Sequence, residues 1–242
     1  MNFKQNIQVC FSTSQFAKYC NNKTAKIVVV VDILRATSVI STAFEHGIEA
    51  VIPVQSLEEA LQYREIENHI IAAERNTLPI EGFDYGNSPY HYMNSNINGK
   101  ILVLTTTNGT KAIHLAMEHK VITASFLNIN SVTNFLTNNN RDIIILCSGW
   151  KGLFNLEDTI FAGALADKLL NTQEFTSNCD SLRASVNLYY NAKDNLFDYL
   201  KKSSYRRRNT SKEVIRDTHF CLNPTISSKI VPTLINGRLI KG

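Results

Sequence analysis

Polar side chains able to do chemistry follow apolar segments of the sequence, at points where a strand would pass into a helix. Asp32 comes directly after the valine run 28–31, and a carboxylate there suits a metal ligand or a nucleophile. Asp is also favoured as a helix N-cap, so a structural role stays open. Arg35 and Thr37 follow within one turn, and could offer a guanidinium fork and a hydroxyl to an oxyanion or simply begin a helix.

The segment 105–110 is unusually rich in hydroxyl groups. It holds four threonines, one asparagine and one glycine after the apolar run 101–104. Hydroxyls and backbone N–H groups at a helix start can hold a phosphate or sulfonate, although they can equally serve only to start the helix. The residue types favour an anion site. Its candidate ligands are Thr106, Thr107, Asn108, Gly109 and Thr110.

Further acids lie in two other segments. Glu74, Glu81 and Asp84 belong to a loop-rich stretch with glycine hinges, which suits carboxylates that approach a cation, although the same residues are common in turns. Glu157 and Asp158 open a predicted helix, where first-turn acids also stabilise the helix dipole without any catalytic role. Hard acids, few histidines and no paired cysteines favour a Mg²⁺ site over a zinc site.

Several common enzyme classes lack support in this sequence. It has no G-x-G-x-x-G, G-x-x-x-x-G-K-[ST], H-E-x-x-H or G-x-S-x-G motif. Leu34 stands where a D-x-D phosphoaspartyl motif would have its second Asp. Dinucleotide-binding proteins, P-loop enzymes, zinc proteases and serine hydrolases are therefore disfavoured.

The apolar segments predict an α/β fold. The runs 27–31, 101–104 and 143–147 have no polar alternation, which is typical of strands buried on both faces. Each run precedes a predicted helix. The first helix is expected to end near 45, the second to end near 119, and the third to span 156–170. We expect a three-layer α/β/α sandwich with a largely parallel or mixed sheet, and a site at the carboxyl ends of its strands. Further predicted elements are strands 50–54, 70–73 and 121–124 and a helix over 57–66, while 76–98 is expected to be a long loop.

The bulk properties predict one globular domain over residues 1–242, whose last third, about 171–242, has the weakest signal. There we expect a helix within 181–200 and a closing edge strand within 230–240. The net charge is +4, and the basic cluster at 201, 202 and 206–208 is interpreted as a solvated face, without a nucleic-acid motif. Five unpaired cysteines, no signal peptide and no membrane span predict a cytoplasmic protein.

Six short segments, in order along the chain, resemble the 2-phosphosulfolactate phosphatase family. They lie in the first two thirds of the sequence, and each is weak alone while the ordered set is specific. The segments are V-D-I-L-R-A-T-S at 31–38, A-E-R at 73–75, E-G-F-D-Y-G-N-S-P at 81–89, T-T-T-N-G-T at 105–110, S-F-L-N at 125–128 and L-E-D-T at 156–159.

The resemblance implies an α/β/α fold, Mg²⁺ dependence, and hydrolysis of (2R)-2-phospho-3-sulfolactate to 3-sulfolactate and phosphate in coenzyme M biosynthesis. By position it makes Asp32, Arg35, Glu157 and Asp158 catalytic candidates and Asp32, Glu74, Glu81, Asp84 and Asp158 metal candidates. The candidate substrate ligands are Arg35, Thr37, Arg75, Asn87, Ser88, Asn128 and the threonine segment above.

Three questions stay open from the sequence. Attack by a metal-activated water and a phosphoaspartyl route through Asp32 both fit the residues. Ser148 and Trp150 depart from the residues expected of the family, so the substrate could be another small phosphorylated acid, and a non-catalytic anion-binding module is the alternative of a different class. We expect the protein to bind a small anionic phosphorylated substrate, and neither nucleic acid nor a membrane. A homodimer is a further expectation.

Overall fold

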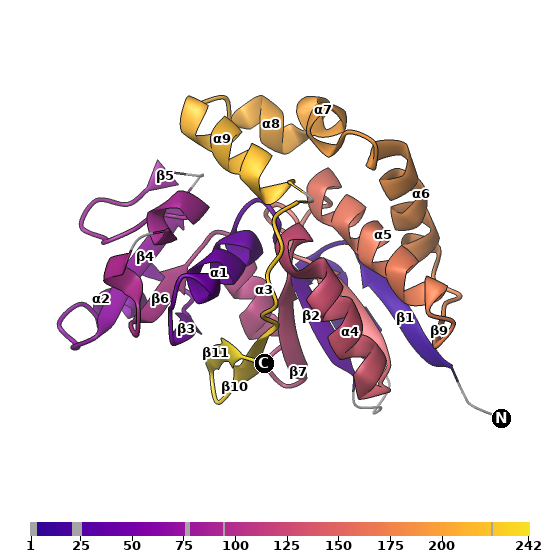
Figure 1. Ribbon diagram of the computed structural model, residues 1–242, viewed down its shortest axis with the longest axis horizontal. Helices are drawn as coiled ribbons and strands as arrows, with labels where there is room; N and C mark the ends of the chain where they lie inside the picture. The colour runs from indigo at the N-terminus through magenta and orange to yellow at the C-terminus, as the bar shows by residue number, and fades with distance from the viewer. Residues whose placement is uncertain (1–3, 21–25, 76–77, 94, 224) are drawn as a thin grey trace.

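The strands form one mixed sheet whose two parallel halves are joined by an antiparallel hairpin (Figure 1). The computed structural model describes residues 4–20, 26–75, 78–93, 95–223 and 225–242. Within them the strand order is β5-β4-β6-β3-β11-β10-β7-β2-β8-β1-β9. The strands are β1 (Gln5–Cys10), β2 (Ile27–Val31), β3 (Ala50–Pro53), β4 (His69–Arg75), β5 (Leu78–Pro79), β6 (Ile101–Thr105), β7 (Lys120–Ala124), β8 (Ile143–Cys147), β9 (Phe175–Thr176), β10 (Pro232–Ile235) and β11 (Arg238–Lys241).

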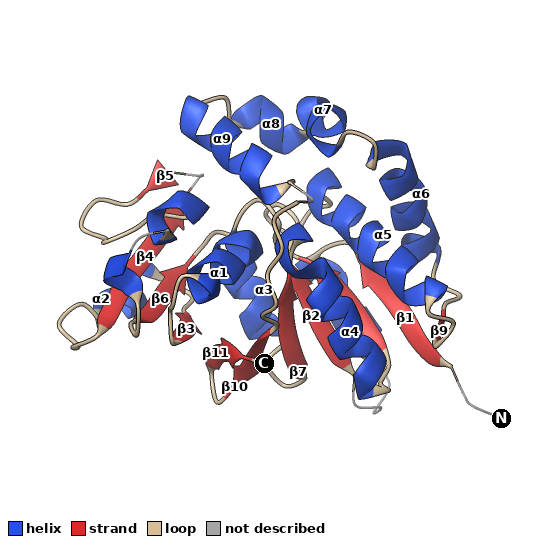
Figure 2. Cartoon of the chain, viewed as in Figure 1, coloured by secondary structure: helices blue, strands red, loops and turns tan. Residues whose placement is uncertain are grey.

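Helices flank this sheet and cross over its upper edge in the view of Figure 2. The helices are α1 (Ala36–Glu45), α2 (Leu57–Leu61), α3 (Gly109–Leu115), α4 (Ile129–Asn139), α5 (Leu156–Asn171), α6 (Asp180–Ala192), α7 (Leu196–Tyr199), α8 (Ser204–Arg208) and α9 (Lys212–Cys221). Short 3₁₀ turns occur as well, at Thr13–Tyr19, Pro89–Tyr92, Ser95–Ile97, Phe126–Asn128 and Leu200–Lys202.

Strand β2 shows why the apolar runs lack polar alternation. All five of its residues are buried, and they point alternately to two hydrophobic clusters on opposite faces of the sheet. Val29 and Val31 pack with side chains of α4, α5 and α6, whereas Val28 and Val30 pack with side chains of α1 and α3. Helices therefore cover both faces, and the predicted α/β fold is confirmed.

The C-terminal strand prediction was wrong in its position. We expected a closing edge strand within 230–240, but this segment forms the β10–β11 hairpin in the interior of the sheet. Strand β10 pairs with β7 and β11 pairs with β3, both antiparallel. Asn128 helps to hold the preceding chain there, because its Nδ2 donates to the Ile230 carbonyl at 3.1 Å. The C-terminal hairpin thus joins the two parallel halves of the sheet. Without it, β7 and β3 would each be an edge strand with unpaired backbone groups.

Other boundaries differ less from the predictions. The helix expected over 57–66 ends at Leu61, and the predicted loop 76–98 contains β5 and two 3₁₀ turns, with residues 76, 77 and 94 outside the described residues. Strand β1 and helices α4, α8 and α9 were not predicted. The division into domains stays a prediction.

Helices α7, α8 and α9 form an arc above the edge of the sheet where the parallel strands end (Figure 1). The arc thus lies over the loops at the carboxyl ends of the strands (Figure 1).

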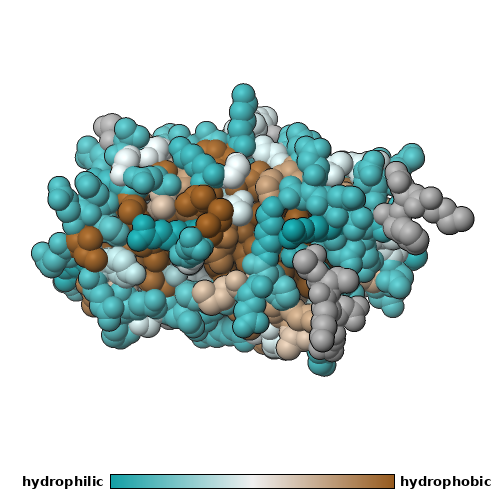
Figure 3. Space-filling view, turned by 90° about the horizontal axis from the view of Figure 1, so that it is seen from below, coloured by the Kyte–Doolittle hydropathy of each residue, from teal (hydrophilic) through white to brown (hydrophobic). Residues whose placement is uncertain are grey.

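Seen from below, the molecule shows apolar residues gathered in the middle of a largely polar face (Figure 3). Among the described residues no helix is both long and apolar enough for a membrane crossing.

Helices α5 and α6 approach each other so closely that Gly163 has no room for a side chain. A Cβ at this position would overlap the carbonyl oxygen of Ser185 on α6. Helix propensity alone would make Gly163→Ala stabilising by about 1 kcal/mol. We instead expect a net loss of up to about 2 kcal/mol in the free energy of unfolding, because overpacking costs about 1–3 kcal/mol and exceeds the gain in propensity. Urea denaturation measures it, with Lys168→Ala on the exposed side of α5 as control; a gain in stability would contradict the close contact.

Candidate functional site

A small polar cavity lies at the carboxyl ends of β2, β4, β6 and β8, beneath the arc of α7, α8 and α9. Its volume is about 20 Å³, and a cavity needs about 10–15 Å³ to hold one water molecule. It therefore has room for about one water or one small ion. Its lining residues are Asp32, Leu34, Arg35, Glu74, Asn87, Asn108, Gly149, Trp150, Asn155, Glu157 and Tyr205.

Asp32 is held by the turn that connects β2 to α1. Its backbone N–H donates to Thr37 Oγ1 at 3.2 Å, its carbonyl accepts from the Thr37 N–H, and Oδ1 accepts from the Ala36 N–H at 3.4 Å. Gly109 lies against the other carboxylate oxygen, since a Cβ there would come within 2.8 Å of Oδ2. Thr37 thus stabilises the turn between β2 and α1 through these hydrogen bonds. Gly109, which has no side chain, lets the threonine segment approach Asp32.

Asp158 stands behind the cavity wall and is fully hydrogen-bonded. Oδ1 accepts from the Ile33 N–H at 3.0 Å, while Oδ2 accepts from the Gly149 N–H at 3.2 Å and from Asn155 Nδ2 at 2.8 Å. Its carboxylate therefore ties the loops after β2 and β8 to the first turn of α5. Glu157, the preceding residue, lines the cavity instead.

The buried carboxyl groups raise one another's pKa values. Burial raises the pKa of Asp32 well above its usual range, and the charges of Asp158 and Glu74 add to this rise. Burial also raises the pKa of Glu157 to about 7, with a contribution from Asp32 that Arg208 partly opposes. The pKa of Asp158 rises to about 7 through burial and the neighbouring Glu157. Such a cluster of raised carboxyl pKa values is typical of functional sites and favours a cation among the acids.

The hydroxyl groups of the threonine segment are largely engaged within the protein. Thr106 Oγ1 accepts from the Thr110 N–H, and Thr110 Oγ1 accepts from the Thr106 N–H, both at 3.2 Å. Thr107 donates to the two oxygens of Glu74 at 3.3 and 3.4 Å. Asn108 alone of the segment lines the cavity, and its Oδ1 accepts from the Lys151 N–H at 3.0 Å. The predicted anion-binding role of the segment stays a prediction.

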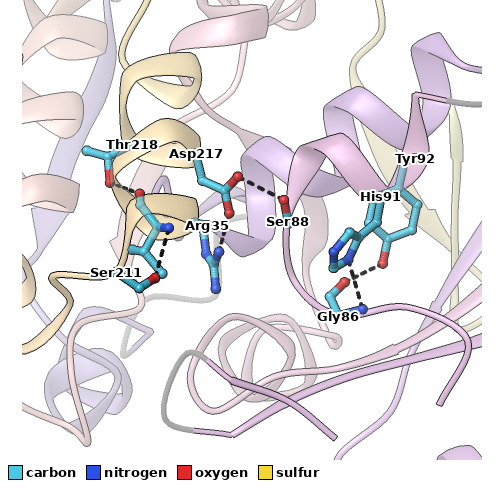
Figure 4. A network of polar contacts seen from close by, with 9 residues as sticks. Arg35, Gly86, Ser88, His91, Tyr92, Ser211, Asp217 and Thr218 are labelled. Carbon is cyan, nitrogen blue, oxygen red and sulfur yellow. Dashed lines mark hydrogen bonds and ion pairs between the residues drawn. The ribbon is translucent and has the colours of Figure 1, made fainter.

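Arg35 makes a buried ion pair with Asp217 of helix α9, as Figure 4 shows. Asp217 is completely buried, and its other oxygen accepts from Ser88 Oγ at 2.8 Å. The pair joins the loop after β2 to the C-terminal third of the chain. Arg35 still lines the cavity, so its guanidinium is held in place at the site by α9.

Four buried polar atoms of the cavity lining have no hydrogen-bond partner among the described residues. Nearly all buried polar atoms in proteins have hydrogen-bond partners. Several unpartnered atoms around one cavity therefore indicate that a bound ligand supplies the missing partners. Three are oxygen acceptors and the fourth is a hydroxyl. They are Asn87 Oδ1, Asn155 Oδ1, Glu157 Oε2 and Tyr205 Oη.

Most of the predicted acids come together, but two do not. Asp32, Glu74 and Glu157 line the cavity with Asp158 directly behind them. Glu81 is exposed, and the exposed Asp84 accepts from the Ile71 N–H at 2.8 Å, as a turn residue would. Neither belongs to the cavity lining. Of the described His, Cys, Asp and Glu side chains, no three are grouped closely enough to form a complete metal site by themselves.

The predicted substrate ligands are similarly divided. Arg35, Asn87 and Asn108 line the cavity, whereas Ser88 acts through Asp217. Arg75 donates to the carbonyl of Glu74 at 2.7 Å and to Thr105 Oγ1 at 3.0 Å, which supports the strand end that carries Glu74. Asn128 lies outside the lining, and its Oδ1 accepts from the Ser125 N–H at 2.9 Å.

Four residues of the site were missed or given no role by sequence reasoning. Asn155 precedes the predicted helix and could have been recognised as a polar residue at a helix start. Trp150 stood out only as a departure from the family pattern. Tyr205 and Asp217 lie in helices that were not predicted, and no local signal distinguishes them from solvent-facing residues.

Comparison with known proteins agrees with the sequence resemblance. The model of the family described as "2-phosphosulpholactate phosphatase" matches residues 12–237. A protein of Caldanaerobacter subterraneus named "Probable 2-phosphosulfolactate phosphatase" is 40% identical over 217 residues, 88% of this chain and 89% of its own. Proteins of the same name from Thermotoga petrophila and Clostridium beijerinckii are 40% and 34% identical, over 91% and 88% of this chain and 94% and 91% of theirs. The chain therefore belongs to the 2-phosphosulpholactate phosphatase family.

Proposed function

We propose that this protein is a Mg²⁺-dependent phosphatase that hydrolyses (2R)-2-phospho-3-sulfolactate to (2R)-3-sulfolactate and phosphate. The observation that carries the proposal is the acid-lined cavity with four partnerless polar atoms at the carboxyl ends of the strands. The names of the relatives support the same substrate. The chain belongs to a family of phosphatases, so the proposal concerns the specific substrate and the metal.

The donor set of the cavity fits Mg²⁺. Asp32 and Glu74 supply carboxylate oxygens, and Asn87 and Asn155 of the same lining have amide oxygens without hydrogen-bond partners among the described residues. Mg²⁺ prefers oxygen ligands and is usually held by one or two carboxylates together with waters and substrate phosphate. It therefore does not need a complete cage of three acidic side chains. Burial and, after it, the charges of Asp158 and Glu74 raise the pKa of Asp32, and a divalent cation would offset both by favouring the charged carboxylate.

When bound, Mg²⁺ would supply positive charge to the phosphoryl oxygens and promote attack on phosphorus. Arg35 lies at the cavity with its guanidinium held by Asp217, and it would bind a phosphoryl oxygen in a fixed orientation. Glu157 has a partnerless Oε2 in the lining, from which a proton can pass to the departing oxygen of the ester. Asp32 would either hold the metal or attack phosphorus itself, and both routes give the same products.

Removal of the metal should abolish activity. Protein treated with EDTA and desalted is expected to release inorganic phosphate from 2-phosphosulfolactate at least about 10²-fold more slowly, because positioned charge at a transferring phosphoryl group is a large part of catalysis. Added Mg²⁺ should restore the rate, whereas Ca²⁺ should restore less because Mg²⁺ demands a tighter octahedral site. Full activity of metal-free protein would contradict the metal proposal. If the protein hydrolyses a generic aryl phosphate but not 2-phosphosulfolactate, the proposed substrate is wrong.

We also propose a cytoplasmic location. All five cysteines are free, including the buried Cys10, Cys147 and Cys221. Free thiols persist in reducing compartments, whereas secreted proteins usually pair them.

A further inference from the structure

Two cations flank Trp150 at the mouth of the cavity. The guanidinium carbon of Arg208 is 4.2 Å from the centre of the Trp150 ring, and Lys151 Nζ is 5.3 Å from it. Both basic side chains belong to exposed residues, and neither forms an ion pair with a carboxylate of the described residues. No ion pair therefore holds these charges, although the charge of Arg208 also acts on the buried Glu157. Contact with the aromatic ring limits where the two cations lie.

The loop that carries Trp150 is firmly attached to the catalytic side of the cavity. Trp150 and Leu153 exchange two backbone hydrogen bonds of 2.9 and 3.0 Å, which close a tight turn. The Gly149 N–H donates to Asp158, and the Lys151 N–H donates to Asn108 of the threonine segment. Gly149 has φ +69°, and a Cβ there would overlap the Leu153 carbonyl, so the turn requires glycine.

Helix α8 also contributes a polar group to the lining of the cavity itself. Tyr205 and Arg208 are three residues apart, so they lie on one face of this helix. Tyr205 is only 3% exposed and lines the cavity, and its hydroxyl has no hydrogen-bond partner in the part of the chain that the structure describes. A buried hydroxyl without a partner indicates that a polar ligand atom reaches this side of the cavity.

Size and charge determine which part of a substrate can reach this mouth. The cavity of about 20 Å³ holds about one water or ion, so most of a three-carbon ester has to lie outside it. Asp32, Glu74 and Glu157 line the interior and would repel a second acidic group that entered. On the proposed function, the phosphoryl group would be bound where a cation offsets these acids, which leaves the remaining acidic groups of the substrate outside the cavity.

We propose that Arg208 and Lys151, arranged on Trp150, bind the strongly acidic group of the substrate that lies away from the phosphoryl group. This inference rests on the proposed function and assigns the sulfonate of the phosphosulfonate to this subsite. It gives a role to Arg208 of the basic cluster, and it makes Trp150 a residue that positions the two cations.

The test compares 2-phosphosulfolactate with 2-phospholactate, which lacks only the sulfonate. In Arg208→Gln we expect the ratio of kcat/KM for the two substrates to fall about tenfold, mainly through KM, because a charge-assisted hydrogen bond to the sulfonate is lost. Lys151→Gln should lower the ratio less, and Arg208→Lys should restore part of it. Arg207→Gln is the matched control, since Arg207 lies on the same helix, carries the same charge and donates to the Lys202 carbonyl.

Calorimetric titration with 3-sulfolactate and with lactate separates this inference from the proposed function. If wild-type protein binds sulfolactate more tightly than lactate and Arg208→Gln removes the difference, the subsite is supported even if no phosphate ester is hydrolysed. If the wild type hydrolyses the phosphosulfonate but Arg208→Gln changes neither the selectivity nor the affinity difference, or matches Arg207→Gln, the inference is overturned while the proposed function stands. Equal losses for both substrates would also overturn it.

Discussion

Asp32→Asn is expected to lower the turnover number by about 10²-fold or more, since loss of a positioned catalytic group typically costs this much. The side chain lines the cavity at the end of β2, beside Glu74 and in front of Asp158. An asparagine would have nearly the same shape and could still accept from the Ala36 N–H. The loss would therefore report the missing charge, through a weaker metal site or a lost nucleophile.

The same substitution should leave the fold intact and make metal-free protein slightly more stable. Burial and two neighbouring carboxylates raise the pKa of Asp32, which means that the folded protein resists its ionisation. A neutral amide removes this repulsion. Near neutral pH, the thermal midpoint of the metal-free variant should be equal to or above that of the wild type, while the stabilisation by added Mg²⁺ should shrink through mass action.

Asp84→Asn is the matched control because the substitution is identical and Asp84 was also predicted as a metal ligand. Asp84 is exposed, and its carboxylate accepts from the Ile71 N–H in a turn. Steady-state kinetics of the two variants should differ by more than tenfold. A comparable loss in Asp84→Asn would mean that its loop closes on the cavity during catalysis, and near-normal turnover of folded Asp32→Asn would leave Asp32 with only a structural role.

The parts of the fold that depend on local pattern were predictable. Strands buried on both faces need unbroken apolar runs, so the segments 27–31 and 143–147 could be recognised with their observed bounds. The rule that parallel strands bring their carboxyl ends together predicted that the segments after the runs 27–31, 101–104 and 143–147 would meet. Asp32, Asn108 and Gly149 of these segments line one cavity.

The parts that depend on tertiary contacts were not predictable. The hairpin 232–241 reads as an edge strand, because nothing local shows that its two sides pair with β7 and β3. Glu81 has the same composition signal as Glu74, but only Glu74 ends a strand of the sheet. The hydroxyl of Thr107 looked available for an anion until its acceptor, Glu74, was seen 33 positions away in the sequence.

The C-terminal third contributes to the site through a contact that also stabilises the fold. Asp217→Ala is expected to lower the free energy of unfolding by about 3–5 kcal/mol, since it leaves the charge of Arg35 buried without a partner. For a chain of this length, that corresponds to a fall of roughly 6–20 °C in the thermal midpoint. Glu213→Ala is the control, because it removes one negative charge from an exposed position of the same helix and should cost only a small fraction of that loss.

A double variant separates stability from catalysis at this ion pair. Replacing both partners, as Arg35→Met with Asp217→Leu, should recover most of the stability lost in Asp217→Ala, because a buried pair can be exchanged for apolar side chains at little net cost. Its phosphatase activity should not recover, since the guanidinium that lines the cavity is gone. If Asp217→Ala is no less stable than Glu213→Ala, the pair contributes nothing to folding; if the double variant is stable and fully active, Arg35 has no part in binding the phosphoryl group.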